Sequence, residues 1–279
     1  CRAGCSKVTR MQIEAFALSD TGKVRKHNED SFCLDDELGL YVVCDGMGGG
    51  NAGEIASALA VETIQTHLAE AAKSADLPLI GPYDASVSVS TNRLASAIRA
   101  ANEAVHRESW SRPDYAGMGT TVVAALLCEE ALAIAHVGDS RLYLVRSGAI
   151  RALTTDHSWV AEQILKGFIT EDEAQCSPRR NIVTKALGVG SSIDVELMEI
   201  PVKSGDTLLL CLDGLTRAVN QNDILRILSE SENLSTMSDR LILMANEAGG
   251  DDNTTVVVVA LRDEFQAGLW ERLKKRFVA

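Results

Sequence analysis

Short apolar runs separated by turn residues recur along this chain, and they are too short to be the faces of long helices. Several are joined by only a few residues, which requires neighbouring strands to run antiparallel. Residues 40–44, for example, follow residues 31–34 after an acidic turn, as expected of a hairpin. The predicted strands are residues 12–19, 31–34, 40–44, 122–127, 131–137, 141–146, 149–153, 195–200, 207–212 and 254–261.

Two long segments have the period of an amphipathic helix instead. In residues 52–75 apolar side chains recur every three or four positions, which places them on one face of a helix. A second long helix is predicted over residues 92–110, ending before Pro113. Two shorter helical segments follow within residues 222–248.

These elements predict an α+β fold. Two packed antiparallel sheets flanked by helices form a four-layer α-β-β-α sandwich, because each sheet then buries both of its faces. Residues 11–262 are expected to be one catalytic domain, with residues 158–188 as a flap-like insertion. Residues 1–10 lack periodicity and are expected to be disordered or foreign to the natural protein. Residues 263–279 predict a basic amphipathic helix that packs on the domain.

The charge balance limits the partners. A net charge of −12 argues against a nucleic-acid-binding surface, which needs clustered Lys and Arg. No apolar segment approaches the roughly 18 residues of a membrane span. The seven cysteines are expected to be reduced thiols. We therefore expect a soluble, cytoplasmic monomer.

Four aspartates occupy matching positions beside the predicted strands. Asp45, Asp139 and Asp213 each follow an apolar run, and Asp252 precedes the last one. In an antiparallel sheet the end of one strand lies beside the start of its neighbour. The four carboxylates can therefore meet at one edge of the sandwich.

Carboxylates gathered in this way need compensating cations, because like charges in a buried place raise each other's pKa strongly. The predicted hairpin adds Glu29 and Asp30 beside Asp45. A set of hard oxygen ligands favours Mn²⁺ or Mg²⁺, with water completing the coordination. Two ions about 3.5–4 Å apart can share a bridging water and make it a nucleophile near neutral pH.

The candidate residues lie within distinctive segments. In chain order these are VRKHNEDS, VCDGMGGGNAGE, GMGTT, AHVGDSRLYLVRSG, LTTDHSWV, PRRNIVTKALG, LLLCLDGLT and GGDDNTTVVVV. Together they resemble the metal-dependent serine/threonine protein phosphatases of type 2C, in their compact bacterial form. The resemblance covers roughly residues 12–261 and implies two packed antiparallel sheets with a two-metal centre at one edge.

The resemblance implies a role for each acidic residue of the set. Asp45 would bridge both metal ions, and the carbonyl of Gly46 would bind one of them. Asp213 and Asp252 would hold the other ion. Asp139, together with Asp213, would form the third-ion site of bacterial members.

Other residues carried over by the resemblance surround that centre. Glu29 would act through metal-bound water, and Asn253 would support the site. Arg25 would grip the substrate phosphate, which suits a planar fork of N–H donors. Arg141 is expected to order the turn that carries Asp139 rather than to touch substrate.

The reaction implied by the resemblance is direct hydrolysis of phosphoserine or phosphothreonine in proteins. A metal-bridging hydroxide attacks phosphorus in line, with no phosphoenzyme intermediate, and the metals and Arg25 neutralise the phosphoryl charge. The partners would be phosphoprotein substrates and a cognate Ser/Thr kinase whose signalling the enzyme opposes.

The chain departs from the family pattern at a few positions. Gly50 stands where many bacterial relatives have His, so the proton donor to the leaving group is not assigned, with His27 and His157 as candidates. Leu212 and Arg217 also differ from the common residues, and both are expected to lie away from the metals.

Three functions are compatible with these features. The leading one is an active Mn²⁺- or Mg²⁺-dependent protein phosphatase. A non-catalytic phosphoprotein-binding relative is the second, although such a protein is expected to have lost metal-binding carboxylates. A metal-dependent hydrolase of another phosphoester, such as a nucleotide, is the third. The acidic balance and the lack of a base-stacking aromatic cluster disfavour it.

Overall fold

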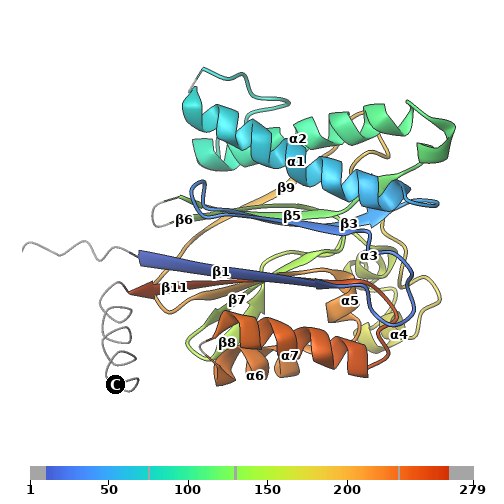
Figure 1. The fold of residues 1–279 in the computed structure, drawn as a ribbon, viewed down its shortest axis with the longest axis vertical. Coiled ribbons are helices and arrows are strands. Elements are labelled where there is room, and N and C mark those ends of the chain that lie inside the picture. The colour runs from blue at the N-terminus through green and yellow to red at the C-terminus, as the bar shows by residue number, and fades with distance from the viewer. Residues whose placement is uncertain (1–10, 75, 129–130, 232, 264–279) are drawn as a thin grey trace, which may run out of the picture.

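The computed structural model describes residues 11–74, 76–128, 131–231 and 233–263. Figure 1 shows four layers: helices, a sheet, a second sheet, and helices again. The predicted α-β-β-α sandwich is therefore confirmed. The predicted segment 1–10 and the predicted helix beyond residue 263 lie outside the described residues, and Asp263 itself ends the last strand.

All strand pairs of the two sheets are antiparallel among the residues that the structure describes. One sheet has the order β1-β11-β10-β7-β8 and the other the order β2-β3-β5-β6-β9. The first contains β1 (Met11–Asp20), β11 (Thr254–Asp263), β10 (Thr207–Cys211), β7 (Arg141–Arg146) and β8 (Ala149–Ala152). The second contains β2 (Asp30–Asp35), β3 (Leu40–Met47), β5 (Val122–Cys128), β6 (Ala131–Val137) and β9 (Glu196–Pro201), and the short β4 (Gly119–Thr120) pairs with β3.

The helices form the outer layers. In Figure 1, α1 (Ala52–Lys73) and α2 (Val89–Ser109) cover the β3 sheet, while α6 (Gln221–Glu230) and α7 (Leu234–Glu247) cover the β11 sheet. The short helices are η1 (Pro113–Tyr115), α3 (Trp159–Leu165), α4 (Glu171–Gln175) and α5 (Asp213–Thr216). No helix in the described ranges has the length and apolarity to cross a bilayer.

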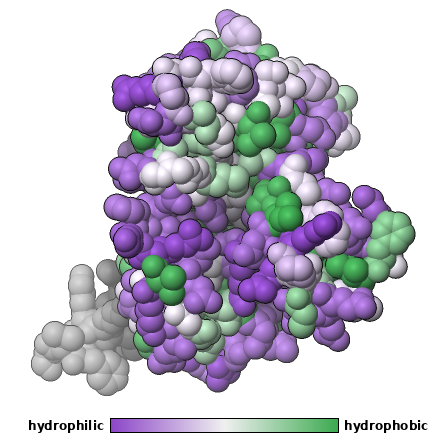
Figure 2. Space-filling model, turned by 90° about the vertical axis from the view of Figure 1, so that its right-hand side faces the viewer, coloured by the Kyte–Doolittle hydropathy of each residue, from purple (hydrophilic) through white to green (hydrophobic). Residues whose placement is uncertain are grey.

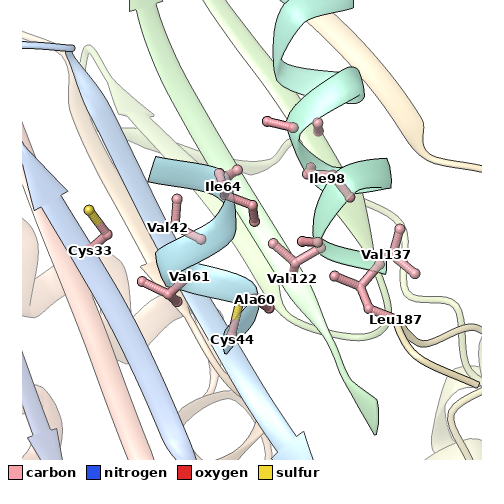
Figure 3. Close-up of a cluster of buried hydrophobic side chains, with 14 of the residues drawn as sticks. Cys33, Val42, Cys44, Ala60, Val61, Ile64, Ile98, Val122, Val137 and Leu187 are labelled. Atoms are coloured by element: carbon pink, nitrogen blue, oxygen red, sulfur yellow. The ribbon is translucent and has the colours of Figure 1, made fainter. Parts of the chain in front are cut away.

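Each interface between layers has its own apolar core. Figure 3 shows the core under α1 and α2, where Ile64 and Ile98 face Val42 and Val122 of the sheet. A second core lies between the two sheets, and a third lies under α6 and α7. The near-continuous apolar strands β3, β5 and β10 follow from this layering, because both of their faces are buried.

The connection from β6 to β7 differs from the hairpin that its length suggests. The two strands do not pair; the chain crosses at residues 138–140 from the β3 sheet to the β11 sheet. Gly138 makes the crossing with φ of 109°, and a Cβ there would lie 2.6 Å from side-chain atoms of Thr121. This position therefore requires glycine.

One helix boundary and one short helix also differ from prediction. The second long helix begins at Val89 rather than residue 92, because the hydroxyl of Ser88 accepts a hydrogen bond from the Thr91 amide and caps the helix. The single turn of α5 was not predicted, since so short a helix leaves no periodic pattern.

The segment 158–188 contains α3 and α4, and main-chain hydrogen bonds join its ends, from Trp159 to Ile182 and from Thr184 to His157.

Candidate metal centre

Asp45 lies near the end of β3 and is fixed by its main chain. Its amide donates to the Thr121 hydroxyl (3.0 Å), and its carbonyl accepts from the Thr120 hydroxyl (2.8 Å) and the Thr121 amide (2.9 Å). The two threonines of GMGTT therefore hold the backbone from which the Asp45 carboxylate projects. Sequence reasoning gave these threonines no role.

Gly46 lies where no side chain fits. A Cβ on this residue would stand 2.0 Å from the carbonyl oxygen of Gly53 and 2.6 Å from that of Glu29. Its amide also donates to the Glu29 carbonyl at 3.1 Å. Gly46, near the end of β3, therefore lets the first turn of α1 and the start of β2 approach the backbone next to Asp45.

Asp139 is carried by the crossing between the two sheets. The next residue, Ser140, hydrogen-bonds the Thr121 hydroxyl at 2.6 Å, which ties the crossing to the segment that holds Asp45. Arg141 makes a two-pronged pair with Asp156, at 2.8 and 2.7 Å. This pair ties the start of β7 to the segment that follows β8.

Asp213 is the first residue of α5, two residues after β10 ends. The following Gly214 packs against the approach to β11, because a Cβ there would lie 1.9 Å from the Asn253 carbonyl oxygen. Asp252 stands on that approach, and its Oδ1 accepts from the Asn253 amide at 2.9 Å. Asp213 and Asp252 are thereby brought to one place from separate parts of the β11 sheet.

Asn253 anchors the loop between β1 and β2. Its Nδ2 donates to the carbonyls of Thr21 (2.9 Å) and His27 (3.0 Å), and its Oδ1 accepts from the Glu29 amide (2.9 Å). This loop carries Arg25, whose half-exposed guanidinium reaches Asp252 Oδ2 at 3.0 Å. The side chain of Asn253 is buried, and these three hydrogen bonds join it to main-chain groups of the loop and of Glu29.

Burial and mutual repulsion dominate the electrostatics of the centre. Burial, followed by the charge of Asp213, raises the pKa of Asp45 well above its ordinary value. The same two causes raise the pKa of Asp139 to about 7, although Arg217 opposes the rise. The pKa of Asp213 is also raised, by burial first, against the lowering effect of Arg217. Glu29 has a raised pKa for the same first reason.

These residues fit divalent cations. Every candidate side-chain ligand is a carboxylate, the donor type that Mn²⁺ and Mg²⁺ accept. One of these oxygens, Oδ1 of Asp213, is buried without a hydrogen-bond partner. A buried oxygen without a donor is costly, and a bound cation would satisfy it.

Arg217 lies inside the centre, so the expectation that it lies away from the metal ligands is wrong. Its Nη2 contacts Asp213 Oδ2 and lies 3.6 Å from Asp139 Oδ2, while Nη1 lies 3.8 Å from Asp252 Oδ2. Arg217 follows Asp213 by four residues across the turn of α5, which places both on one side of it. Because sequence reasoning missed α5, it missed this relationship.

The two histidines considered as proton donors differ in their surroundings. His157 is buried, accepts a hydrogen bond from the Gly138 amide at Nδ1 (3.1 Å) and pairs through Nε2 with Glu196 (3.1 Å). Its ring also stacks on that of His136, with centroids 4.8 Å apart. His157 therefore supports the crossing that carries Asp139, while His27 is exposed on the β1–β2 loop.

His136, His157 and Glu196 are also the one group of three or more His, Cys, Asp or Glu in the described ranges whose ligand atoms converge within 4.8 Å. The two rings are nearly parallel, at 10°, so their in-plane lone pairs do not point at one common position. His136 Nε2 is also engaged by the Thr155 carbonyl at 2.9 Å. We interpret this group as a structural stack.

The end of the sandwich that carries α3, α4 and α5 is turned toward the viewer in Figure 2. Its surface is mostly hydrophilic, with separate hydrophobic patches. An exposed polar end of this kind admits a large substrate more readily than a closed apolar pocket does.

Known proteins share this architecture. The family model described as protein phosphatase 2C matches residues 23–252. The serine/threonine phosphatase stp of Listeria monocytogenes serotype 4b is 38% identical over 253 residues, which are 90% of this chain and 96% of that protein.

Solved structures agree. The serine/threonine phosphatase PstP/Ppp of Mycobacterium tuberculosis superposes with a TM-score of 0.79 at 35% identity, over 90% of this chain and 99% of that one. The catalytic domain of PstP in complex with 2 manganese ions gives a TM-score of 0.77 at 34% identity, over 91% of this chain and 100% of that one.

The two-sheet sandwich and the carboxylate centre at its edge define a metal-dependent phosphatase. The chain belongs to the protein phosphatase 2C family.

Proposed function

We propose that this chain, a metal-dependent protein serine/threonine phosphatase, removes phosphate from phosphoserine and phosphothreonine at the edge formed by Asp45, Asp139, Asp213 and Asp252. The observation that carries the proposal is the gathering of these four aspartates, whose charges act on one another, together with a buried oxygen of Asp213 that lacks a hydrogen-bond partner. Two divalent ions held there would supply Lewis acidity, lowering the pKa of water and neutralising phosphoryl charge.

Different residues of the chain would hold the two ions. Asp45 and the Gly46 carbonyl would hold one ion, and Asp45, Asp213 and Asp252 would hold the other. Thr120 and Thr121 hold the Asp45 backbone in place for this task. Because these contacts fix the main chain of Asp45 before any ion arrives, less ordering remains to be done when the ion binds.

Arg25 would bind the phosphoryl group. Its guanidinium is half exposed at the rim of the centre, and its partner Asp252 is itself a proposed ligand. A fork of N–H donors can pair with two phosphoryl oxygens and stabilise the charge that develops on them during in-line attack. Asn253 holds the loop that carries Arg25, and Glu29 would orient water from beside Gly53.

The cation would be Mn²⁺ or Mg²⁺, since both prefer carboxylate and carbonyl oxygens. The PstP structure with manganese supports two ions of this kind in the family. The resemblance also implies a third ion beside Asp139 and Asp213. The guanidinium of Arg217 lies beside these same two carboxylates, so binding of a third ion would compete with it.

The remaining parts of the proposal concern the cellular setting. We propose that residues 11–262 act as one catalytic domain and that residues 158–188, beside the centre, contact phosphoprotein substrates. The protein would work as a cytoplasmic bacterial monomer against a cognate Ser/Thr kinase. The relatives named serine/threonine phosphatases support the phosphoprotein substrates of this proposal.

A phosphate-release assay tests the activity. We expect hydrolysis of p-nitrophenyl phosphate and of a phosphothreonine peptide to require Mn²⁺ or Mg²⁺, to stop in excess EDTA and to return when metal is added back. Full activity in EDTA would refute the metal-dependent mechanism. Metal-dependent release from a nucleotide but not from the peptide would indicate another phosphoester. Peptide binding without hydrolysis would indicate a non-catalytic relative.

A further inference from the structure

Arg217 is a cation already placed among the candidate metal ligands. Its guanidinium contacts Asp213 and lies 3.6 Å from Asp139 Oδ2 and 3.8 Å from Asp252 Oδ2. Three of the four aspartates of the centre therefore have the same positive neighbour.

The position of Arg217 is built into the fold. The single turn of α5 puts residues 213 and 217 on the same side, and the Arg217 amide donates to the Asp213 carbonyl at 2.9 Å. Gly214, pressed against the Asn253 carbonyl, fixes how α5 sits on the edge of the sheet. The Arg217 side chain is 30% exposed, so most of this side chain lies against the protein rather than in water.

The guanidinium offsets part of the repulsion in the centre. Its positive charge lies against Asp213 and 3.6 Å from Asp139, two carboxylates whose like charges otherwise repel each other. A divalent ion beside the same two carboxylates would do the same, and two cations so close together repel each other.

We infer that Arg217 is an internal cation on the side of the centre bounded by Asp139 and Asp213, and that it keeps a third divalent ion from binding there. The inference rests on the proposed two-ion function. No contact of Arg217 reaches Asp45, so the ion held by Asp45 and the Gly46 carbonyl does not compete with the guanidinium. The second ion shares Asp213 and Asp252 with Arg217, so its binding would displace the guanidinium from these two carboxylates and leave it beside Asp139. The chain would thus hold two exchangeable ions and one positive side chain.

Metal counting on the full chain tests the inference without an activity readout. The metal-free protein is titrated with Mn²⁺ by isothermal calorimetry, and bound Mn²⁺ is counted after equilibrium dialysis. We expect two Mn²⁺ per wild-type chain and three per Arg217→Gln chain. Without metal, Arg217→Gln should melt at a lower temperature than wild type, and Mn²⁺ should raise its melting temperature by more.

Two matched variants isolate the charge and the position. Arg217→Lys keeps a cation and should bind two ions. Arg226→Gln removes an arginine paired with Asp223 at 2.8 Å on α6, outside the centre, and should also bind two. Equal Mn²⁺ counts and affinities in wild type and Arg217→Gln would overturn the inference. So would three ions in the wild type.

Asp139→Asn decides the matter even if Arg217→Gln does not fold. Because Asp139 is paired with Arg217 and not with an ion, Asp139→Asn should leave two ions bound, and loss of an ion would overturn the inference. Failure of the proposed function has a different signature: no Mn²⁺ would bind to any variant, wild type included.

Discussion

Asp30 stands directly opposite Asp45 in the antiparallel pairing of β2 and β3. Asp30 also accepts a 2.6 Å hydrogen bond from the Thr255 hydroxyl, which lowers its pKa, but burial outweighs that bond and raises the pKa to about 7. The hairpin thus adds a further acidic group behind the candidate ligands. In the absence of metal this cluster of carboxyl groups resists ionisation.

The first prediction concerns pH. A carboxyl whose pKa rises from 3.8 to about 7 on folding favours the folded state below pH 3.8, and that stabilisation is lost as the pH rises toward 7. The metal-free protein in EDTA should therefore melt at a lower temperature at neutral pH than at about pH 5. Thermal unfolding followed by circular dichroism measures the difference.

Asp30→Asn should flatten that dependence, whereas Asp239→Asn, on the exposed side of α7, should leave it unchanged. A melting temperature in EDTA that rises from pH 5 to 7 would show that the carboxyl cluster is not the controlling group.

The second prediction concerns the ligands. Asp45→Asn and Asp213→Asn each remove a charged oxygen ligand from the centre, so turnover of p-nitrophenyl phosphate should fall by orders of magnitude, roughly 10²-fold or more. Both variants should keep the wild-type circular dichroism spectrum. Asp223→Asn, at the start of α6, is the control and should retain activity. Near-normal turnover by Asp45→Asn would contradict the assignment.

The third prediction concerns Arg25. Arg25→Ala should raise KM for a phosphothreonine peptide by roughly ten- to a hundredfold, because a charge-assisted pair is worth about 1.5–3 kcal/mol. Binding of Mn²⁺ should persist, since the arginine is not a ligand. Lys26→Ala, a neighbouring cation on the same exposed loop, is the control. Loss of Mn²⁺ binding in Arg25→Ala, measured by calorimetry, would contradict this division of roles.

The fourth prediction uses two nearby glycines, Gly46 near the end of β3 and Gly49 in the turn that follows. Gly46→Ala would put a Cβ 2.0 Å from the Gly53 carbonyl oxygen, so the backbone beside Asp45 must shift. At Gly49 a Cβ meets nothing within 4 Å. We expect Gly46→Ala to lose stability in urea by about 1–3 kcal/mol and to bind Mn²⁺ more weakly. Gly49→Ala should match wild type, and equal effects of the two substitutions would refute the packing argument.

Much of the fold follows from the sequence because strand signals here are strong. The hairpin of β2 and β3 was predicted with the right neighbours for Asp45, since the turn length fixes the register. The crossing at Gly138 was not predictable from its length, because a short connection can join strands of one sheet or of two. The packing of Gly138 against Thr121 belongs to the connection between two sheets, and this packing cannot be read from the length of the connection.

The candidate site was predicted unevenly for a similar reason. An aspartate at the end of a strand can be recognised from the sequence because it follows an apolar run, as Asp45 does. Arg217 gives no such signal, because its importance depends on the one turn of α5. Thr120 and Thr121 were likewise missed, since their role is to hold the backbone of a residue far away in the sequence.

The crossing of the chain from β6 to β7 has a thermodynamic consequence. Asp45 belongs to the β3 sheet and Asp139 to the crossing between the sheets, whereas Asp213 and Asp252 flank strands of the β11 sheet. An ion shared among them is bound by both halves of the sandwich, so its binding free energy also opposes their separation. By the same linkage, loosening the apolar layer between the sheets, at Val123 or Leu210 for instance, must weaken cation affinity at the edge.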